Sequence, residues 1–159
     1  MTDKIKVIFS DVDGTLTDGR LHYNINGEVI KSFHVKDGAG IKNWMLTGNE
    51  FGVISARSSE IVSIRMKELN VTHVIMEADD KKTILGDWLR GRDYSWENLG
   101  YIGDDINDLA VIKAAGFSAA PADATEIVRQ SVQYCCKSCG GMGAVREFID
   151  FLLDGTPAS

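Results

Sequence analysis

Short apolar runs alternate along the chain with longer segments in which apolar residues recur every three or four positions. The short runs have the length of buried strands, and the longer segments have the period of amphipathic helices. This alternation predicts an α/β fold built on a doubly wound, mostly parallel sheet. The expected strands are Ile5–Ser10, Phe51–Ser55, His73–Met76, Leu99–Ile102 and Gly116–Ala119.

Three of the segments between or after these strands carry a clear apolar stripe at helical spacing. The first is expected to begin after Ser58 or Ser59, because serine is a preferred N-cap residue. The stripes consist of Val62, Met66 and Leu69, of Ile84, Leu85, Trp88 and Leu89, and of Val145, Phe148, Ile149, Leu152 and Leu153.

One stretch interrupts the alternation of strands and helices. Arg20–Tyr23 and Val29–His34 have the pattern of two short strands, and Asn26-Gly27 between them is a strong hairpin signal. The hairpin, at about residues 20–34, follows the first strand directly. We therefore expect it to project over the strand ends, where open α/β sheets bind ligands.

The first expected strand ends in a pair of acids. Asp11 and Asp13 lie two positions apart, and Gly14 and Thr15 follow them in a turn. Two carboxylates at the end of a buried strand repel each other unless a positive group lies between them. Hard oxygen ligands of this kind select Mg²⁺. The motif therefore indicates phosphoryl chemistry.

Three further polar groups follow later strands: Ser55-Ala56-Arg57, Asp80-Lys81-Lys82 and Gly103-Asp104-Asp105-Ile106-Asn107-Asp108. The carboxyl ends of parallel strands share one edge of a sheet, so these groups should converge on Asp11. Spacing leaves open whether Lys81 or Lys82 faces inward. It also leaves open whether Asp108 supports a metal site or lies on a helix surface.

Each converging residue has a plausible chemical role. Asp11 can attack phosphorus to give an aspartyl-phosphate, and Asp13 can protonate the leaving alkoxide and then deprotonate the attacking water. Asp104 can hold Mg²⁺ together with Asp11. Ser55 can donate a hydrogen bond to the phosphoryl group, although alone it would pass for an N-cap or loop residue. Lys81 can supply positive charge to the same group.

Composition narrows these possibilities. A length of 159 residues predicts a single domain over residues 1–159, and the formal net charge of −6 without a basic stripe argues against nucleic-acid binding. No apolar run is long enough to span a membrane, and Met1-Thr2-Asp3-Lys4 has no character of a signal peptide, so we expect a cytoplasmic protein. Cys135, Cys136 and Cys139 are expected to be reduced thiols that pack a turn.

The motifs together resemble those of the haloacid dehalogenase (HAD) superfamily of phosphohydrolases. The resemblance rests on Asp11-Val12-Asp13-Gly14-Thr15, Ser55, Lys81 and Gly103-Asp104-Asp105 with Asp108, and it spans most of the chain. It implies a HAD-like Rossmannoid fold. It also implies that Asp11 is the nucleophile, that Asp13 is the acid/base, and that Mg²⁺ is bound by Asp11, the Asp13 carbonyl and Asp104.

The chain has no room for a cap domain between its motifs, and Phe33–Ile41 and Gly140–Glu147 are similar to the capless branch of the superfamily. That branch includes phosphatases of 3-deoxy-D-manno-octulosonate 8-phosphate (KDO 8-phosphate) and of nonulosonate 9-phosphates. The resemblance implies a homotetramer in which a neighbour's hairpin and its glycine-rich tail, at about residues 140–143, help to close the site.

The same resemblance implies a set of residues that contact the substrate, and these residues favour two different substrate classes. Arg57 favours the octulosonate enzymes, whereas Lys36, where those enzymes have arginine, and Gly140-Gly141 are closer to the sialic-acid enzymes. The implied contacts are Asp13, His34, Val35, Lys36, Asp37, Gly38, Lys42, Arg57 and Arg65.

The leading hypothesis is a Mg²⁺-dependent phosphomonoesterase for a phosphorylated 2-keto-3-deoxy sugar acid, with KDO 8-phosphate first. The alternatives are a sialic acid or KDN 9-phosphate phosphatase and a non-catalytic regulatory domain associated with a cytidylyltransferase. A receiver-type signalling module also combines acids, a hydroxyl and a lysine, but it lacks an acid in the position of Asp13.

Overall fold

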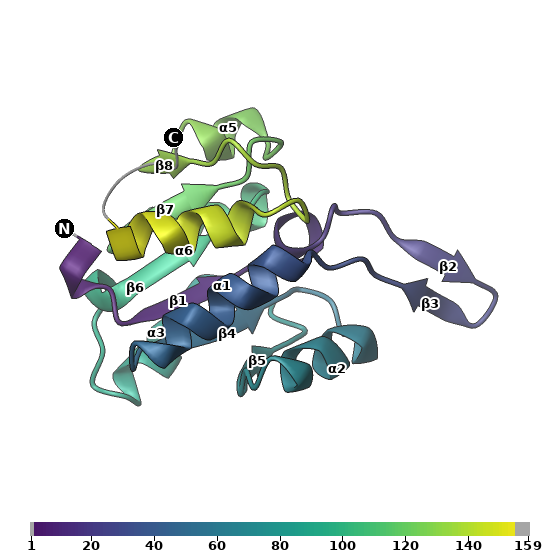
Figure 1. Cartoon of the computed structure of the whole chain (residues 1–159), viewed down its shortest axis with the longest axis horizontal. Helices are drawn as coiled ribbons and strands as arrows, with labels where there is room; N and C mark the ends of the chain where they lie inside the picture. The colour runs from purple at the N-terminus through teal and green to yellow at the C-terminus, as the bar shows by residue number, and fades with distance from the viewer. Residues whose placement is uncertain (1, 155–159) are drawn as a thin grey trace.

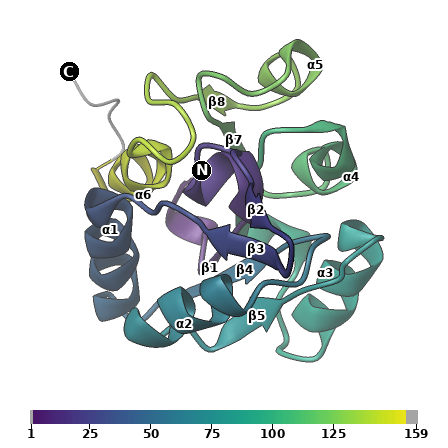
Figure 2. The same ribbon diagram turned by 90° about the vertical axis from the view of Figure 1, so that its right-hand side faces the viewer.

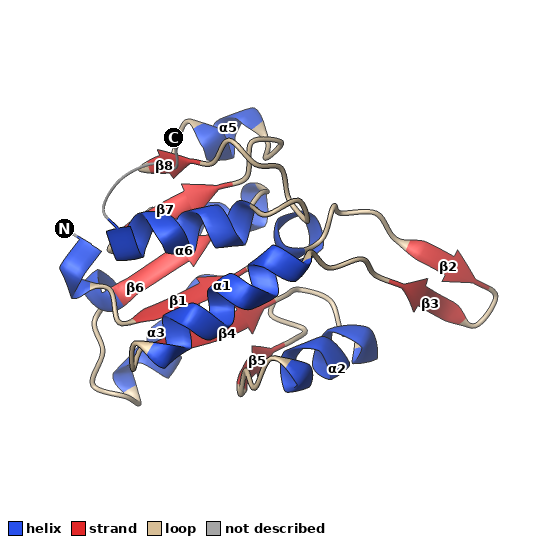
Figure 3. Ribbon diagram, in the orientation of Figure 1, coloured by secondary structure: helices blue, strands red, loops and turns tan. Residues whose placement is uncertain are grey.

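The computed structural model describes residues 2–154 and contains a six-stranded sheet, drawn in red in Figure 3. The strand order is β5-β4-β1-β6-β7-β8, and every neighbouring pair is parallel, as the alternation of elements predicts. The strands are β1 (Val7–Ser10), β4 (Glu50–Ile54), β5 (His73–Ile75), β6 (Leu99–Ile102), β7 (Phe117–Ala120) and β8 (Tyr134–Cys135).

Helices cover both faces of the sheet (Figures 1 and 2). One face carries α1 (Val35–Leu46), α2 (Glu60–Glu68) and α6 (Ala144–Asp154), and the other carries α3 (Lys81–Arg90), α4 (Leu109–Ile112) and α5 (Glu126–Arg129). Short helical turns lie at Thr2–Lys4, Val12–Leu16, Trp96–Asn98 and Ile106–Asp108. Within residues 2–154, no helix has both the length and the apolar character needed to cross a bilayer.

Strand β1 lies at the centre of the sheet, and the core forms around it. Ile8 belongs to the apolar cluster under α1, α2 and α6, whereas Val7 and Phe9 belong to the cluster under α3, α4 and α5. All three side chains are fully buried, as expected for a strand covered on both faces. Packing on two faces therefore fixes the strand that presents Asp11.

The hairpin consists of β2 (His22–Asn24) and β3 (Gly27–Ile30) and projects from the body beyond the carboxyl ends of the strands (Figure 1). It is shorter than the predicted span, because the stretch after Ile30 is an irregular connection to α1. The turn residues are Ile25 and Asn26, since Asn24 pairs with Gly27, which itself adopts a φ of 116°. The turn therefore lies within Asn24–Gly27, where the Asn-Gly signal indicates it.

The apolar stripes correctly predicted α2, α3 and α6 but not α1, the longest helix of the described residues. Ser59 caps α2 by accepting a hydrogen bond from the Val62 amide, which settles the choice between the two serines. Leu153, predicted to belong to the stripe of α6, is 40% exposed and lies at its edge. Strand β8 was not predicted, because two residues are too few to show a period.

The glycine-rich segment 140–143 packs on the loop that carries the two motif aspartates. The Gly141 amide donates to the Thr15 carbonyl at 3.0 Å, and the Gly140 amide donates to the Asp123 carboxylate at 2.8 Å. A Cβ atom on Gly140 would lie 1.9 Å from the Gly14 carbonyl oxygen. The segment is therefore a close backbone contact within the chain, and glycine is required there for steric reasons.

This contact yields a test of stability. Gly140→Ala should lower the free energy of unfolding by about 1–3 kcal/mol, because the backbone of two loops must move apart. The measurement is a urea unfolding curve at constant m value. Gly91→Ala is the matched control, since its Cβ atom would make only ordinary contacts, the nearest at 3.6 Å. Equal effects of the two substitutions would contradict the steric account.

Candidate active site

The strand order brings the predicted catalytic groups together at one edge of the sheet. Asp11 follows β1, Ser55 follows the neighbouring β4, and Asp104 lies two residues after β6 on the other side of β1. This is the topological switch point, where doubly wound sheets bind ligands. A pocket of about 120 Å³ opens there, and its lining residues are Asp11, Asp13, Ser55, Ala56, Arg57, Asp104, Asp105 and Asn107.

The tight turn after β1 depends on Gly14. Its φ is 96°, a left-handed conformation that glycine adopts without strain. A Cβ atom at this position would also lie 2.1 Å from Oδ2 of Asp104. Glycine therefore lets the loop that carries Asp11 and Asp13 approach the loop after β6, so that the acids of the two loops share one site.

Lys81 neutralises part of the negative charge of this site. Its Nζ lies 2.6 Å from Oδ1 of Asp11 and 2.8 Å from Oδ1 of Asp108, and its side chain is almost completely buried. Asp80 caps α3 by accepting a hydrogen bond from the Thr83 amide, which places Lys81 on the first turn of the helix. Lys82 is exposed. The choice that spacing left open is therefore resolved in favour of Lys81.

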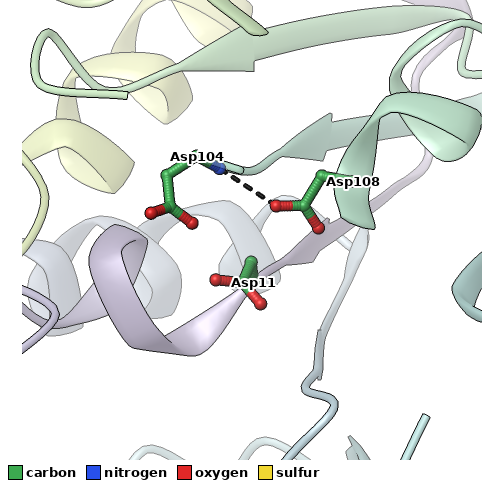
Figure 4. A group of neighbouring side chains, drawn as sticks. All are labelled: Asp11, Asp104 and Asp108. Carbon is green, nitrogen blue, oxygen red and sulfur yellow. Dashed lines mark hydrogen bonds between the residues drawn. The ribbon is translucent and has the colours of Figure 1, made fainter. Parts of the chain in front are cut away.

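Asp108 is fully buried and organises the loop after β6. Its carboxylate accepts hydrogen bonds from the Tyr101 hydroxyl and from the backbone amides of Asp104 and Asp105, at 3.0 and 3.3 Å. Figure 4 shows it facing Asp11 and Asp104. Its oxygens already have donors, including Lys81. This arrangement excludes the helix-surface alternative and makes Asp108 a support for the neighbouring acids.

The three carboxylates form an electrostatically crowded group. Oxygens of Asp11, Asp104 and Asp108 all lie within 4.8 Å of one another. Burial raises the pKa of Asp11 well above its usual value, with repulsion from Asp108 adding to the effect and Lys81 opposing it. Burial also raises the pKa of Asp104, to about 6. A divalent cation bound by oxygen would relieve this crowding, so the donor set fits Mg²⁺.

Ser55 contributes a hydroxyl to the same pocket. The residue is buried, and its Oγ accepts a hydrogen bond from the Arg57 amide at 3.1 Å. Ser59, rather than Ser55, caps the following helix. The Ser55 hydroxyl hydrogen therefore remains available for an anion in the pocket.

Asp13 has a partner that the sequence did not indicate. Its carboxylate forms an ion pair with Lys31, a residue at the root of the hairpin whose side chain is completely buried. Arg57 lies on the other side, with Nε 3.7 Å from Oδ2 of Asp13. Lys31 follows Asp13 by 18 positions and belongs to no local motif. Only the way the hairpin folds back brings the two residues together.

Seven predicted substrate contacts do not line the pocket and lie on α1, on α2 or just before α1: His34, Val35, Lys36, Asp37, Gly38, Lys42 and Arg65. The His34 side chain accepts a hydrogen bond from the Lys36 amide and caps α1. The Arg65 guanidinium lies over the Phe33 ring, 5.8 Å from its centroid, and pairs with Glu68 at 2.9 Å. Within one chain, the structure does not bring these seven residues into the pocket beside Asp11.

Asp37 and Gly38 occupy positions with evident structural roles. Asp37 is buried and accepts a hydrogen bond from the Arg146 amide at 2.8 Å, which ties α1 to the start of α6. Burial raises the pKa of its carboxyl group above the usual value. A Cβ atom on Gly38 would lie 2.6 Å from the Arg65 guanidinium, so glycine leaves room for that side chain beside α1.

Comparisons with known proteins show which family the chain belongs to. A family model described as haloacid dehalogenase-like hydrolase matches residues 53–149. The 3-deoxy-D-manno-octulosonate 8-phosphate phosphatase KdsC of Haemophilus influenzae is 42% identical over 151 residues, which are 95% of this chain and 84% of that protein.

Solved structures give the same result. The cobalt-bound form of the H. influenzae phosphatase superposes with a TM-score of 0.93 at 41% identity, covering 96% of this chain and 90% of that one. The Moraxella catarrhalis enzyme, in complex with magnesium, phosphate and KDO, gives a TM-score of 0.94 at 36% identity, covering 98% and 89%. The chain therefore belongs to the haloacid dehalogenase-like hydrolases.

Proposed function

We propose that this protein is a Mg²⁺-dependent phosphatase that hydrolyses KDO 8-phosphate to KDO and inorganic phosphate. The observation that carries the proposal is the buried group of Asp11, Lys81 and Asp108 beside Asp104, in a chain 42% identical to a KDO 8-phosphate phosphatase. The predicted substrate contacts left two substrates open, KDO 8-phosphate and a nonulosonate 9-phosphate. The relatives favour the first of these.

The reaction proceeds in two displacements. An oxygen of Asp11 attacks phosphorus, the bond between phosphorus and the sugar oxygen breaks, and Asp13 gives a proton to the leaving alkoxide. Water then attacks the aspartyl-phosphate, Asp13 accepts its proton, and phosphate and free Asp11 are released. Lys81 holds the Asp11 carboxylate at 2.6 Å, and the Ser55 hydroxyl donates to a phosphoryl oxygen.

The donors proposed for the cation are Asp11, Asp104 and the Asp13 carbonyl, because the Asp108 oxygens are already engaged. When bound there, Mg²⁺ would neutralise negative charge on the phosphoryl oxygens. Asp104 approaches this position because Gly14 leaves room for it. The cation would therefore lie among the crowded carboxylates around the buried Asp11.

The size of the pocket supports a further element of the proposal, a homotetramer. A volume of about 120 Å³ is well below the roughly 300–1,000 Å³ of typical small-molecule sites, so it accommodates the phosphoryl group but not the sugar acid.

The hairpin exposes a cluster of apolar side chains and therefore suits a protein partner. We propose that hairpins of neighbouring copies, with cationic residues such as Arg65, complete the sugar site. The exposed hairpin residues are Leu21, Tyr23, Ile25, Val29 and Ile30.

We also assign the reaction to the cytoplasm. All three cysteines are free, and Cys135 and Cys139 are exposed. Exposed free thiols are typical of proteins that work in a reducing compartment. The substrate proposed here, a small phosphorylated metabolite, fits the same location.

Phosphate release from a panel of monoesters tests the activity directly. We expect KDO 8-phosphate to be hydrolysed with Mg²⁺ present, and N-acetylneuraminate 9-phosphate to be hydrolysed more slowly. Asp11→Asn should abolish turnover, because an amide is not a nucleophile, with a loss of about 10⁴-fold or more. Lys113→Met, an exposed change away from the pocket, is the control. No release from KDO 8-phosphate, or activity retained in Asp11→Asn, would refute the proposal.

Sedimentation equilibrium tests the assembly. Ile25 is fully exposed at the hairpin tip, so Ile25→Asp should leave the fold of the single chain intact but shift the tetramer toward smaller species. It should also raise KM for KDO 8-phosphate more than it lowers kcat. Ile64→Asp, an exposed apolar residue on α2, provides a comparison of equal chemistry. A monomeric wild-type protein would rule the tetramer out.

A further inference from the structure

We propose that Lys31 is a positioning residue for Asp13, so that the root of the hairpin orients the acid/base carboxylate. The inference rests on the proposed phosphatase function and adds to it a residue that no sequence motif indicates. It also assigns the hairpin a role within its own chain, separate from any contact with a neighbour.

The placement of Lys31 is unusual for a lysine in a projecting element. Its side chain is completely buried, and Nζ lies between the Asp13 carboxylate and Oε1 of Glu28, which is 2.8 Å away. Removing an ammonium group from water is unfavourable unless paired charges compensate for it. Within residues 2–154, the two buried lysines are Lys31 and Lys81, and each contacts one of the two motif aspartates.

Lys31 is itself held in place from the body of the protein. Glu28 accepts a hydrogen bond from the Ser59 hydroxyl at 2.6 Å, and Ser59 is the N-cap of α2. Arg57, on the loop after β4, lies 3.9 Å from Glu28 and 3.7 Å from Asp13. The chain of contacts therefore runs from α2 through Glu28 to Lys31 and ends on the acid/base residue.

The Asp13 side chain needs such support. The turn around Gly14 fixes the backbone of Asp13 but leaves its side-chain torsions free to change. Among the described residues, the charged partners of its carboxylate are Lys31 and Arg57, and the Lys31 contact is the shorter. Asp13 must give a proton to the leaving oxygen and later accept a proton from water. Both transfers lose efficiency when the orientation of its carboxyl group is not fixed.

A comparison of leaving groups separates this role from a general effect on folding. A sugar alkoxide needs a proton as it leaves, whereas p-nitrophenolate leaves readily without one. The kcat/KM value covers the steps up to departure of the leaving group, so it reports on Asp13 as an acid and not on the later attack of water. A residue that acts through Asp13 must therefore matter more for the alkyl ester than for the aryl ester.

The experiment measures kcat/KM of wild type and Lys31→Met for p-nitrophenyl phosphate and for the alkyl phosphate that wild type hydrolyses best. We expect a loss of about 10–100-fold for the alkyl ester and a several-fold smaller loss for the aryl ester. Asp13→Asn should show the same selectivity with a larger loss. Glu28→Gln removes the negative charge that pairs with Lys31 but keeps the shape of the Glu28 side chain. It should show the same selectivity with a smaller loss of kcat/KM.

The controls make each outcome decisive. Lys113→Met removes an exposed lysine that does not line the pocket and should leave both kcat/KM values unchanged. If Lys31→Met is misfolded by circular dichroism, the Glu28→Gln values decide the question. Equal losses for the two esters would overturn the inference and leave the proposed function intact. A wild-type protein that hydrolyses no phosphate monoester would overturn the proposed function itself.

Discussion

The rest of the site depends on one constraint, the burial of several carboxylates at the end of the central strand. Asp11 emerges from β1 with helices on both faces, so water cannot fully solvate its charge, and Asp104 and Asp108 lie close by. Lys81 compensates for part of this negative charge and leaves an excess. That excess explains why the site favours a divalent cation, and why a phosphoryl group can approach an aspartate at all once the cation is bound.

The residues around these carboxylates stabilise an arrangement that would otherwise be unfavourable. Asp108 uses its oxygens on Lys81, Tyr101 and two backbone amides, so it fixes the loop of Asp104 without competing for an external ligand. Gly14 permits the two acidic loops to meet, and Gly140 packs a third loop against them. Glycine is required at both Gly14 and Gly140, since a side chain there would collide with its neighbours.

The sequence predicted those parts of the site that follow from strand ends. Asp11, Ser55, Lys81 and Asp104 each come shortly after a strand, or begin the helix that follows one, and parallel strands bring such positions together. It could not predict Lys31, because the partner of that lysine is set by how a projecting hairpin folds back. Nor could it predict that Asp37 would tie two helices together. The assignments of His34, Lys36, Lys42 and Arg65 came from resemblance and stay proposals, since the chain by itself does not place them in the pocket.

The pH dependence of thermal stability, with and without Mg²⁺, is the most direct test of the role of these crowded carboxylates. The pKa of Asp104 in the folded protein is raised from its usual 3.8 to about 6. The folded state therefore holds more protons than the unfolded state between these two pH values, and the metal-free protein loses stability as pH rises through this range. Mg²⁺ should therefore raise Tm strongly at about pH 8 and much less at about pH 5, where protons compete for the same oxygens. Asp104→Asn should reduce both the pH effect and the response to Mg²⁺. An equal rise in Tm at both pH values, or an unchanged response in Asp104→Asn, would contradict the claim that crowded carboxylates create the cation site.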